Sequence, residues 1–304
     1  METTQTVTVF GGTGFLGRRV VDCLRQKGAS VRIASRHPDR GRKLFGKDTD
    51  RLRSIEVDIH DVGSVRKAIA GAEAAVNAVS LYVEHGSETF QSVHVDAARG
   101  VARTAREAGV QRLIHISGIG SDPNSSSNYI KARGQGELAV RDAFPDVTLI
   151  RPAVMFGADD AFLRPIVDLL RRLPVYPLFG LGKTRLQPAF VEDVALAVVV
   201  ATQQSDAGTR TIECAGPRIY TYEALLRTIA DAMKVHRPLM PMPFAAWHIL
   251  AGIAEWLPKP AITRNQVELM EHDNVAAPDS PGFAELGIAP RSLEEFLPTI
   301  LHDR

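Results

Sequence analysis

The sequence contains little sulfur and almost no net charge. Its 304 residues include two cysteines, Cys23 and Cys214, which lie far apart and form neither a metal-ligand spacing nor a disulfide framework. Two unpaired cysteines in a chain of this length fit a reducing compartment. Lysine and arginine number 36 against 35 acidic residues, so the formal net charge is +1. Such a balance predicts no general attraction to nucleic acid or to a membrane surface.

Long apolar runs are also lacking. No uninterrupted apolar stretch reaches about 18 residues, the length that a transmembrane helix needs. The first predicted strand begins at Thr6, which leaves no room for a signal or transit peptide. We therefore expect a cytoplasmic protein. A chain of this length and apolar content can build one large domain with a smaller lobe.

A glycine-rich turn between a strand and a helix is the most informative feature that is present. The strand spans 6–10, the helix runs to Lys27, and Gly28 follows as a stop signal. Glycines in such a turn allow a tight bend, a close approach of the backbone to a pyrophosphate, and close helix packing. The N–H groups at the helix start then face the phosphate charge. Cofactor contacts are predicted from Gly11, Thr13, Gly14, Phe15, Leu16 and Gly17.

The glycines of this turn fit two spacings. Gly12, Gly14 and Gly17 give GxGxxG, whereas Gly11, Gly14 and Gly17 give the GxxGxxG pattern that is typical of short-chain dehydrogenases/reductases. The alternative interpretation is a structural turn that binds nothing, although such a turn rarely needs three glycines at these offsets.

Strands and helices alternate through the first half of the chain. Strands are predicted at 6–10, 31–34, 54–57, 74–79, 112–117 and 147–150, with helices at 62–70, 90–108 and 129–143. This alternation predicts an α/β fold with a doubly wound parallel sheet of the Rossmann type. Ligands of such sheets bind at the carboxyl ends of the strands. Ala78, Val79, Pro152 and Ala153 lie at such ends and are predicted to contact the cofactor.

The pattern loosens after the sixth strand. Helical segments at 163–173, 191–202, 222–233, 244–257 and 292–301 are separated by prolines and glycines. We therefore predict two parts. Residues 1–152 form a Rossmann domain that binds NAD(P), and residues 153–304 form a smaller, mostly helical lobe for substrate or partner that interleaves with the sheet.

The end of the second strand bears on the choice of cofactor. An acidic residue there would bind the ribose 2′-hydroxyl of NAD(H), and a basic residue accommodates the 2′-phosphate of NADP(H). The strand ends with Ser35, Arg36 and His37, and no carboxylate appears before Asp39. The planar guanidinium of arginine suits a phosphate. We predict NADP(H), with NAD(H) as the alternative and a solvated basic loop as the interpretation without a cofactor role.

The short-chain dehydrogenase/reductase resemblance implies further site residues. Asp58 and Ile59 resemble the Asp–apolar pair that contacts adenine in that superfamily, although Asp58 could equally cap the following helix. Its reductases use a tyrosine as the proton donor or acceptor, a lysine four residues later and a serine on the preceding strand. Here Tyr129 is followed four residues later by Arg133, and Ser117 ends the preceding strand. These three are the candidate catalytic residues, and each is also predicted to contact the cofactor.

This catalytic set departs from the pattern of the superfamily. Lys131 stands two positions after the tyrosine, so it would point away from that face of the helix. Arg133 supplies a charge but does not reproduce an ammonium group. Extended members place a hydroxyl two residues after Ser117, where this chain has Ile119. The alternative is that Tyr129 only touches the cofactor or packs against the sheet.

Several downstream segments narrow the resemblance to one group. They are Arg151 to Asp160, Pro177 to Pro188, Val191 to Ala195, Thr263 to Val275 and Leu286 to Pro290. Together they resemble the atypical short-chain dehydrogenases/reductases that include alpha-subcomplex subunit nine of respiratory complex I and its bacterial relatives. The resemblance implies a nucleotide-bound Rossmann domain, often with an incomplete catalytic set.

An apolar helix with two tryptophans is predicted at 244–257. It is too short to span a bilayer, but it could lie on a membrane or meet a partner, so that the protein would be peripheral to a membrane. The alternative is that this helix covers the substrate pocket.

Two functions follow from these observations. The first is an NADP(H)-binding oxidoreductase-like protein that transfers hydride to or from an apolar carbonyl or quinone-like substrate. The second is a non-enzymatic, nucleotide-bound structural or assembly subunit of a respiratory membrane complex, which Arg133 and Ile119 favour. No nucleic-acid partner is expected.

Overall fold

The computed structural model describes residues 5–204, 208–257 and 262–302. The chain divides into two compact units, and each is formed from three segments. The first unit comprises Met1–Pro152, Val191–Cys214 and Asp279–Ile288, and the second comprises Ala153–Phe190, Ala215–Pro278 and Ala289–Arg304.

The first unit is built on a seven-stranded parallel sheet with the strand order β11-β6-β5-β4-β1-β2-β3. Its strands are β1 (Thr6–Phe10), β2 (Ser30–Ser35), β3 (Leu52–Glu56), β4 (Ala74–Asn77), β5 (Arg112–Ile116), β6 (Thr148–Pro152) and β11 (Arg210–Cys214). The strand order reverses between β1 and β4. A parallel sheet of this order binds ligands in the crevice where the order reverses, outside the carboxyl ends of the strands. The predicted α/β fold class is confirmed.

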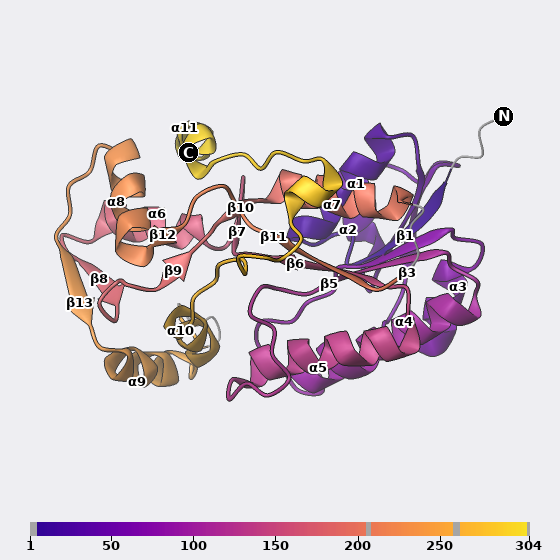
Figure 1. Cartoon of the computed structure of the whole chain (residues 1–304), viewed down its shortest axis with the longest axis horizontal. Coiled ribbons are helices and arrows are strands. Elements are labelled where there is room, and N and C mark those ends of the chain that lie inside the picture. Colours follow the sequence, from indigo (N-terminus) through magenta and orange to yellow (C-terminus); the bar gives the residue numbers. More distant parts are fainter. Residues whose placement is uncertain (1–4, 205–207, 258–261, 303–304) are drawn as a thin grey trace. The chain divides into compact units, whose positions relative to one another are not determined.

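Helices cover both faces of this sheet (Figure 1). One face carries α1 (Phe15–Gln26), α2 (Pro38–Phe45) and α7 (Val191–Gln203), and α1 packs against α7. The other face carries α3 (Val62–Ile69), η1 (Gln91–Ala97), α4 (Ala98–Glu107) and α5 (Asn128–Ala143). On that face α4 packs between α3 and α5.

The first strand forms from a short run of β-branched and apolar residues that is buried on both faces, and the first helix forms because its apolar residues recur at helical spacing. Val7, Val9 and Phe10 of β1 have no exposed surface, and Val20, Val21 and Leu24 of α1 are equally buried. Each side chain of this size stabilises the fold by about 1.5–3 kcal/mol when it is fully buried. The helix ends where Gly28 adopts a φ of +81°, as the stop signal predicts.

Four elements of the first unit were not predicted. They are the short helix α2, the edge strand β11, the π-helical turn η1 inside the predicted helix 90–108, and a 3₁₀ turn at 283–286. The two segments that the first unit takes from beyond residue 152 supply β11, α7 and the 3₁₀ turn η2 (Phe283–Leu286). A π-helical turn inserts one residue into a helical turn and often lies near a functional site.

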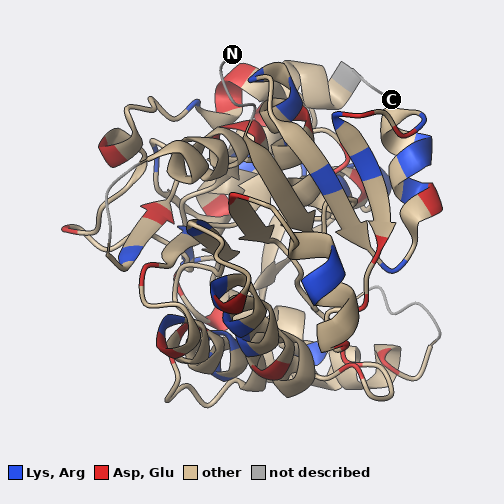
Figure 2. Ribbon diagram, turned by 90° about the vertical axis from the view of Figure 1, so that its right-hand side faces the viewer, with Lys and Arg blue, Asp and Glu red and all other residues tan. Residues whose placement is uncertain are grey.

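The second unit combines helices with short strand pairs. Its helices are α6 (Leu163–Arg172), α8 (Tyr222–Ala232), α9 (Phe244–Ala254), α10 (Arg264–Glu271) and α11 (Leu293–His302). The strand pairs are β7 (Met155–Phe156) with β10 (Ala189–Phe190), β8 (Tyr176–Phe179) with β13 (Leu239–Met242), and β9 (Arg185–Leu186) with β12 (Tyr220–Thr221). Acidic and basic residues are interspersed over the ribbons (Figure 2), in agreement with the balanced composition.

Helix α9 has one packed face and one exposed apolar face. Trp247 donates a hydrogen bond from its indole N–H to the carbonyl oxygen of Leu178 at 2.9 Å and lies 4.3 Å from the Phe179 ring. Ile249 and Ile253 are exposed, and Trp256, just after the helix, is 91% exposed. Within the described residues, no helix is long and apolar enough to cross a membrane.

Candidate functional site

The glycine turn after β1 leaves no room for side chains at two positions. Gly11 has a φ of +73°, and a Cβ atom there would lie 2.8 Å from the carbonyl oxygen of Ala78. A Cβ atom on Gly17 would lie 2.1 Å from the carbonyl oxygen of Gly11. Gly11 therefore permits the tight bend after β1, where the chain passes close to the end of β4. Gly17 lets α1 approach that bend, so the backbone geometry requires glycine at both positions.

Gly14 has a different role from these two glycines. It is exposed and is the N-cap residue of α1, and its amide donates a 2.9 Å hydrogen bond to the Gly11 carbonyl oxygen. Among the described residues no side chain caps α1. The first N–H groups of a twelve-residue helix are therefore available to an anion, where the helix dipole also favours negative charge. A dinucleotide pyrophosphate fits this cradle.

The predicted contacts from β4 lie next to this turn. The Ala78 amide donates to the Phe10 carbonyl oxygen at 3.0 Å, and the Val79 amide donates to the Asn77 side-chain oxygen at 3.3 Å. The structure therefore brings Ala78 and Val79 together with Gly11 at the point where the strand order reverses. Thr13, Phe15 and Leu16 belong to the same turn or to the first turn of α1.

Ser35, Arg36 and His37 lie at the carboxyl end of β2, as predicted. The Ser35 hydroxyl accepts a hydrogen bond from the His37 amide at 3.1 Å. The Arg36 side chain is 58% exposed, and its Nη1 lies 3.2 Å from Oε1 of Glu88. The basic residues that follow belong to helix α2 rather than to a loop, and Arg42 pairs there with Asp39 and Asp48. The contact of this segment with a cofactor stays a prediction, and so does the alternative that its basic residues are only solvated.

Asp58 and Ile59 follow β3 at the same edge. Oδ1 of Asp58 accepts a hydrogen bond from the His60 amide at 3.0 Å. Helix α3 is capped instead by Asp61, which accepts hydrogen bonds from the amides of Gly63 and Ser64. The alternative that Asp58 is the helix cap is therefore wrong, and its contact with adenine stays a prediction.

Tyr129 and Arg133 meet one turn apart on α5, as their spacing predicts. Nη1 of Arg133 donates to the Tyr129 hydroxyl at 2.5 Å. Nε of Arg133 is buried and finds no hydrogen-bond partner in the described part of the chain. A Cβ atom on Gly118 would lie 3.3 Å from the guanidinium carbon, so this glycine makes room for the arginine. Lys131 is exposed, as expected for a residue on another face of the helix.

Three rings enclose the Tyr129 side chain. Tyr82 stacks on it with 5.7 Å between ring centroids, and Phe90 and His94 meet it edge to face at 5.4 and 5.6 Å. Tyr129 is 5% exposed. Gly136 of α5 lets η1 come this close, because a Cβ atom there would lie 2.1 Å from the His94 carbonyl oxygen.

Burial dominates the electrostatics around Tyr129. It raises the pKa of the Tyr129 hydroxyl to about 12, although the neighbouring Arg133 charge acts in the opposite direction. Burial, with the charge of Arg133 as the second cause, lowers the pKa values of His94 and His115 to about 3. At neutral pH the site therefore holds a protonated phenol, two neutral imidazoles and one guanidinium.

Ser117 lies at the end of β5 and is buried. Its hydroxyl lies 3.0 Å from the hydroxyl of Ser121, which donates to the Gly118 carbonyl oxygen. Ile119 occupies the intervening segment, and its amide donates to the carbonyl oxygen of Pro152 at 3.1 Å. Pro152 ends β6, and Ala153 begins the second unit.

Sequence reasoning missed Tyr82, His94 and Glu88. The helical period places His94 inside a predicted helix, where it reads as a core residue, and only the π-helical turn η1 brings it to Tyr129. Tyr82 and Glu88 lie in the loop between β4 and η1, which must start at the carboxyl edge of the sheet. Nothing in a single sequence specifies which neighbouring strand ends this loop reaches.

A buried ion triad supports α5 from behind the site. Arg151 of β6 donates two hydrogen bonds to Glu137 of α5, at 2.8 and 2.6 Å, and lies 3.3 Å from Glu213 of β11. Tyr129, Arg133 and Glu137 are spaced four residues apart and therefore share one face of α5. The triad fixes that face against the sheet.

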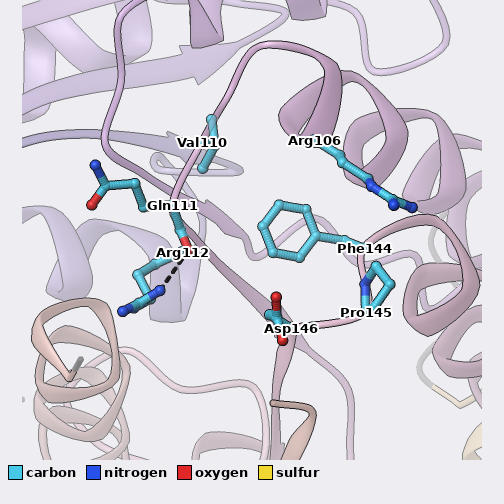
Figure 3. Close-up of a pocket in the computed structure, with 7 residues that line it drawn as sticks. All are labelled: Arg106, Val110, Gln111, Arg112, Phe144, Pro145 and Asp146. Atoms are coloured by element: carbon cyan, nitrogen blue, oxygen red, sulfur yellow. Dashed lines mark hydrogen bonds between the residues drawn. The ribbon is translucent and has the colours of Figure 1, made fainter. Parts of the chain in front are cut away.

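A hollow lies at the opposite, amino-terminal edge of the sheet, where β5 and β6 begin (Figure 3). It measures about 630 Å³ and includes Arg112 at the start of β5, and Phe144 and Asp146 just before β6. Parallel sheets of this type bind their nucleotides at the carboxyl edge, so this hollow is not the candidate site.

Comparison with known proteins identifies an NAD(P)H-binding family. A family model described as NAD(P)H-binding matches residues 11–161. The chain is 35% identical over 296 residues to mitochondrial NADH dehydrogenase (ubiquinone) 1 alpha subcomplex subunit 9 of Rattus norvegicus, covering 94% of this chain and 77% of that subunit. It is 31% identical over 244 residues to a ceramide reductase of Caulobacter vibrioides, covering 78% and 73% of the two chains.

Solved structures share the fold at low sequence identity. The NADPH complex of the quinone oxidoreductase QOR2 of Escherichia coli has a TM-score of 0.76 at 18% identity, covering 97% of this chain and 99% of that one. MoeE5 with UDP-glucuronic acid and NAD has a TM-score of 0.72 at 18% identity, covering 98% of each chain. The chain belongs to the family of NAD(P)H-binding, short-chain dehydrogenase/reductase-like proteins that includes alpha subcomplex subunit 9 of mitochondrial NADH dehydrogenase.

Proposed function

We propose that this chain binds NADP(H) as a resident ligand at the carboxyl edge of its sheet and acts as a nucleotide-bound subunit or assembly partner. The glycine turn carries the proposal. Its backbone excludes side chains at Gly11 and Gly17, and it presents a helix N-terminus without a side-chain cap among the described residues. The turn, together with Ala78 and Val79, would hold the pyrophosphate side of the nucleotide.

The choice of NADP(H) over NAD(H) rests on the end of β2. Arg36 is exposed there, and no acidic side chain follows the strand before Asp39. A guanidinium can donate two hydrogen bonds to a ribose 2′-phosphate. Asp58 and Ile59 lie at the end of the neighbouring strand, where they would flank adenine.

The environment of Tyr129 disfavours hydride transfer from an alcohol substrate. That direction needs the tyrosine as a general base, which must lose its proton near the working pH, but burial raises the pKa of Tyr129 to about 12. The rings of Tyr82, Phe90 and His94 also cover the tyrosine. Relatives named as complex I subunits align over almost the whole chain.

The second candidate is a reductase that transfers hydride to or from an apolar carbonyl or quinone-like substrate. Bound NADPH would supply the hydride. The contact between Tyr129 and Arg133 favours this activity, since a protonated phenol held by a cation can donate a proton to a carbonyl oxygen. An apolar hollow of about 470 Å³ in the second unit includes Phe179, Leu181 and Phe244 and could take an apolar group.

Helix α9 is the proposed contact with a membrane complex or a membrane surface. Ile249, Ile253 and Trp256 form an exposed apolar face around this helix. Large exposed apolar patches mark interaction sites on proteins. The protein would then be peripheral to the membrane.

Purified protein can separate the two roles. Native mass spectrometry should detect a bound nucleotide with the mass of NADP(H), and NADPH oxidation with a short-chain quinone should not exceed the buffer rate. If NADPH oxidation saturated with the quinone and Tyr129→Phe abolished it, the reductase function would replace the role as a nucleotide-bound subunit.

Replacing Arg36 with Asp should lower the ratio of NADPH affinity to NADH affinity at least about tenfold, since the 2′-phosphate loses its cationic partner. An unchanged ratio would refute the role of Arg36.

A further inference from the structure

The loop at residues 80–89, here called the strap, follows the carboxyl edge of the first unit from Tyr129 to Arg36. At one end, Nε2 of His94 lies 3.0 Å from the carbonyl oxygen of Leu81, and Tyr82 stacks on Tyr129. Near the other end, the backbones of His85 and Glu88 exchange two hydrogen bonds of 2.9 Å. The strap is therefore an ordered element that reaches both the tyrosine and the end of β2.

Glu88 of the strap stands between two basic side chains. Its Oε1 lies 3.2 Å from Nη1 of Arg36 and 3.5 Å from Nε2 of His60. Arg36 follows β2 and His60 follows β3, so the carboxylate spans the ends of two neighbouring strands. The side chain of Glu88 is 27% exposed, more buried than that of Arg36.

Glu88 of the strap therefore provides a carboxylate next to Arg36, at a strand end that has no acidic residue of its own. A nucleotide phosphate bound to Arg36 carries a charge of about −1.5 to −2 and would meet the negative charge of Glu88 at the same guanidinium. We propose that Glu88 determines cofactor preference by competing with the 2′-phosphate of NADP(H) for Arg36. This inference rests on the proposed nucleotide site.

The competition should be modest rather than prohibitive. An ion pair between partly exposed side chains contributes little net free energy, so a bound phosphate can displace the carboxylate. NAD(H) carries no 2′-phosphate and leaves the pair of Arg36 and Glu88 in place. Glu88 therefore lowers the preference for NADP(H) that Arg36 alone would confer.

The test compares two fragments of the cofactor, 2′,5′-ADP and 5′-AMP, which differ only in the 2′-phosphate. In Glu88→Gln, which keeps the shape of the side chain, calorimetry should show an affinity for 2′,5′-ADP that is about threefold to tenfold higher. The affinity for 5′-AMP should change by less than about twofold. Glu107→Gln is the matched control, because Glu107 pairs with Arg66 at 3.1 Å in another exposed ion pair and should alter neither affinity.

Two outcomes would overturn the inference. One is an unchanged affinity of Glu88→Gln for 2′,5′-ADP. The other is weaker binding of 5′-AMP alone, since that would assign the carboxylate to the ribose hydroxyl. Both leave nucleotide binding intact. If the wild-type protein bound neither fragment and neither NADPH nor NADH, the proposed site itself would fail.

Discussion

The glycine turn and the Tyr129 pocket lie in the same unit but are built in different ways. The turn consists of neighbouring residues whose backbones touch, with Gly17 close against Gly11. The pocket gathers Tyr129 from α5, His94 from η1, Phe90 just before η1 and Tyr82 from the strap. The first can be recognised from a short motif, and the second depends on how distant segments fold together.

This difference matters because the turn bears on nucleotide binding and the pocket bears on catalysis. The backbone of the turn has few ways to change without losing its shape, so its presence is strong evidence for a nucleotide. The pocket keeps a tyrosine and a cation, yet burial raises the pKa of the tyrosine to about 12.

The largest effect is expected at the turn. Gly17→Ala places a methyl group 2.1 Å from the backbone oxygen of Gly11, so the start of α1 must move. NADPH affinity should fall at least about 100-fold, and the free energy of unfolding should fall by about 1–3 kcal/mol. Calorimetry and thermal unfolding measure the two effects.

Gly100→Ala is the control for this substitution. Gly100 lies in α4, and a Cβ atom there would have no heavy atom within 4 Å. Replacement should stabilise the helix by about 0.5–1 kcal/mol and leave NADPH binding unchanged. Equal losses of affinity in both variants would mean that the close packing of the turn is not what binding requires.

Lowering the pH should reduce stability through the buried histidines near Tyr129 and not through the glycine turn. His94 and His115 have pKa values lowered to about 3, so the unfolded chain, with values near 6.5, binds more protons between these limits. The free energy of unfolding should therefore fall as the pH drops from about 6.5, by about 2 kcal/mol for each histidine at pH 4.5. Denaturant titrations at several pH values measure this slope, and His115→Gln should reduce it. An identical slope in the variant would contradict the assignment.

A smaller effect is expected from the tyrosine hydroxyl. Tyr129→Phe removes the acceptor of Nη1 of Arg133 and should lower the free energy of unfolding by about 1–3 kcal/mol. NADPH affinity should change less than about threefold. Tyr222→Phe is a matched control, because its buried hydroxyl lies 2.9 Å from that of Tyr176 in the second unit. A much larger loss of affinity in Tyr129→Phe alone would make the tyrosine a main binding residue.

The smallest effect is expected at Lys131. Its side chain is exposed and lies on another face of α5. Lys131→Ala should alter the free energy of unfolding by less than about 0.5 kcal/mol and leave NADPH affinity unchanged. A clear loss of binding in a calorimetric titration would show that this lysine replaces the one that the superfamily places four residues after the tyrosine.

The sequence predicts the alternating elements of the first unit well because each carries its own signal. Strand β1 is a continuous buried run, helix α1 has a helical apolar period, and Gly28 and Gly109 adopt positive φ at helix ends. Strand β11 escaped prediction because its residues alternate weakly and include Arg210 and Glu213, whose partners come from elsewhere. The enclosure of Tyr129 could not be predicted, since it depends on a loop and a π-helical turn.

Calorimetric titration of the wild-type chain with NADPH tests the central claim most directly. The account predicts saturable binding of one nucleotide per chain, which Gly17→Ala abolishes while Gly100→Ala retains it. A folded wild-type protein that binds neither NADPH nor NADH would contradict the account.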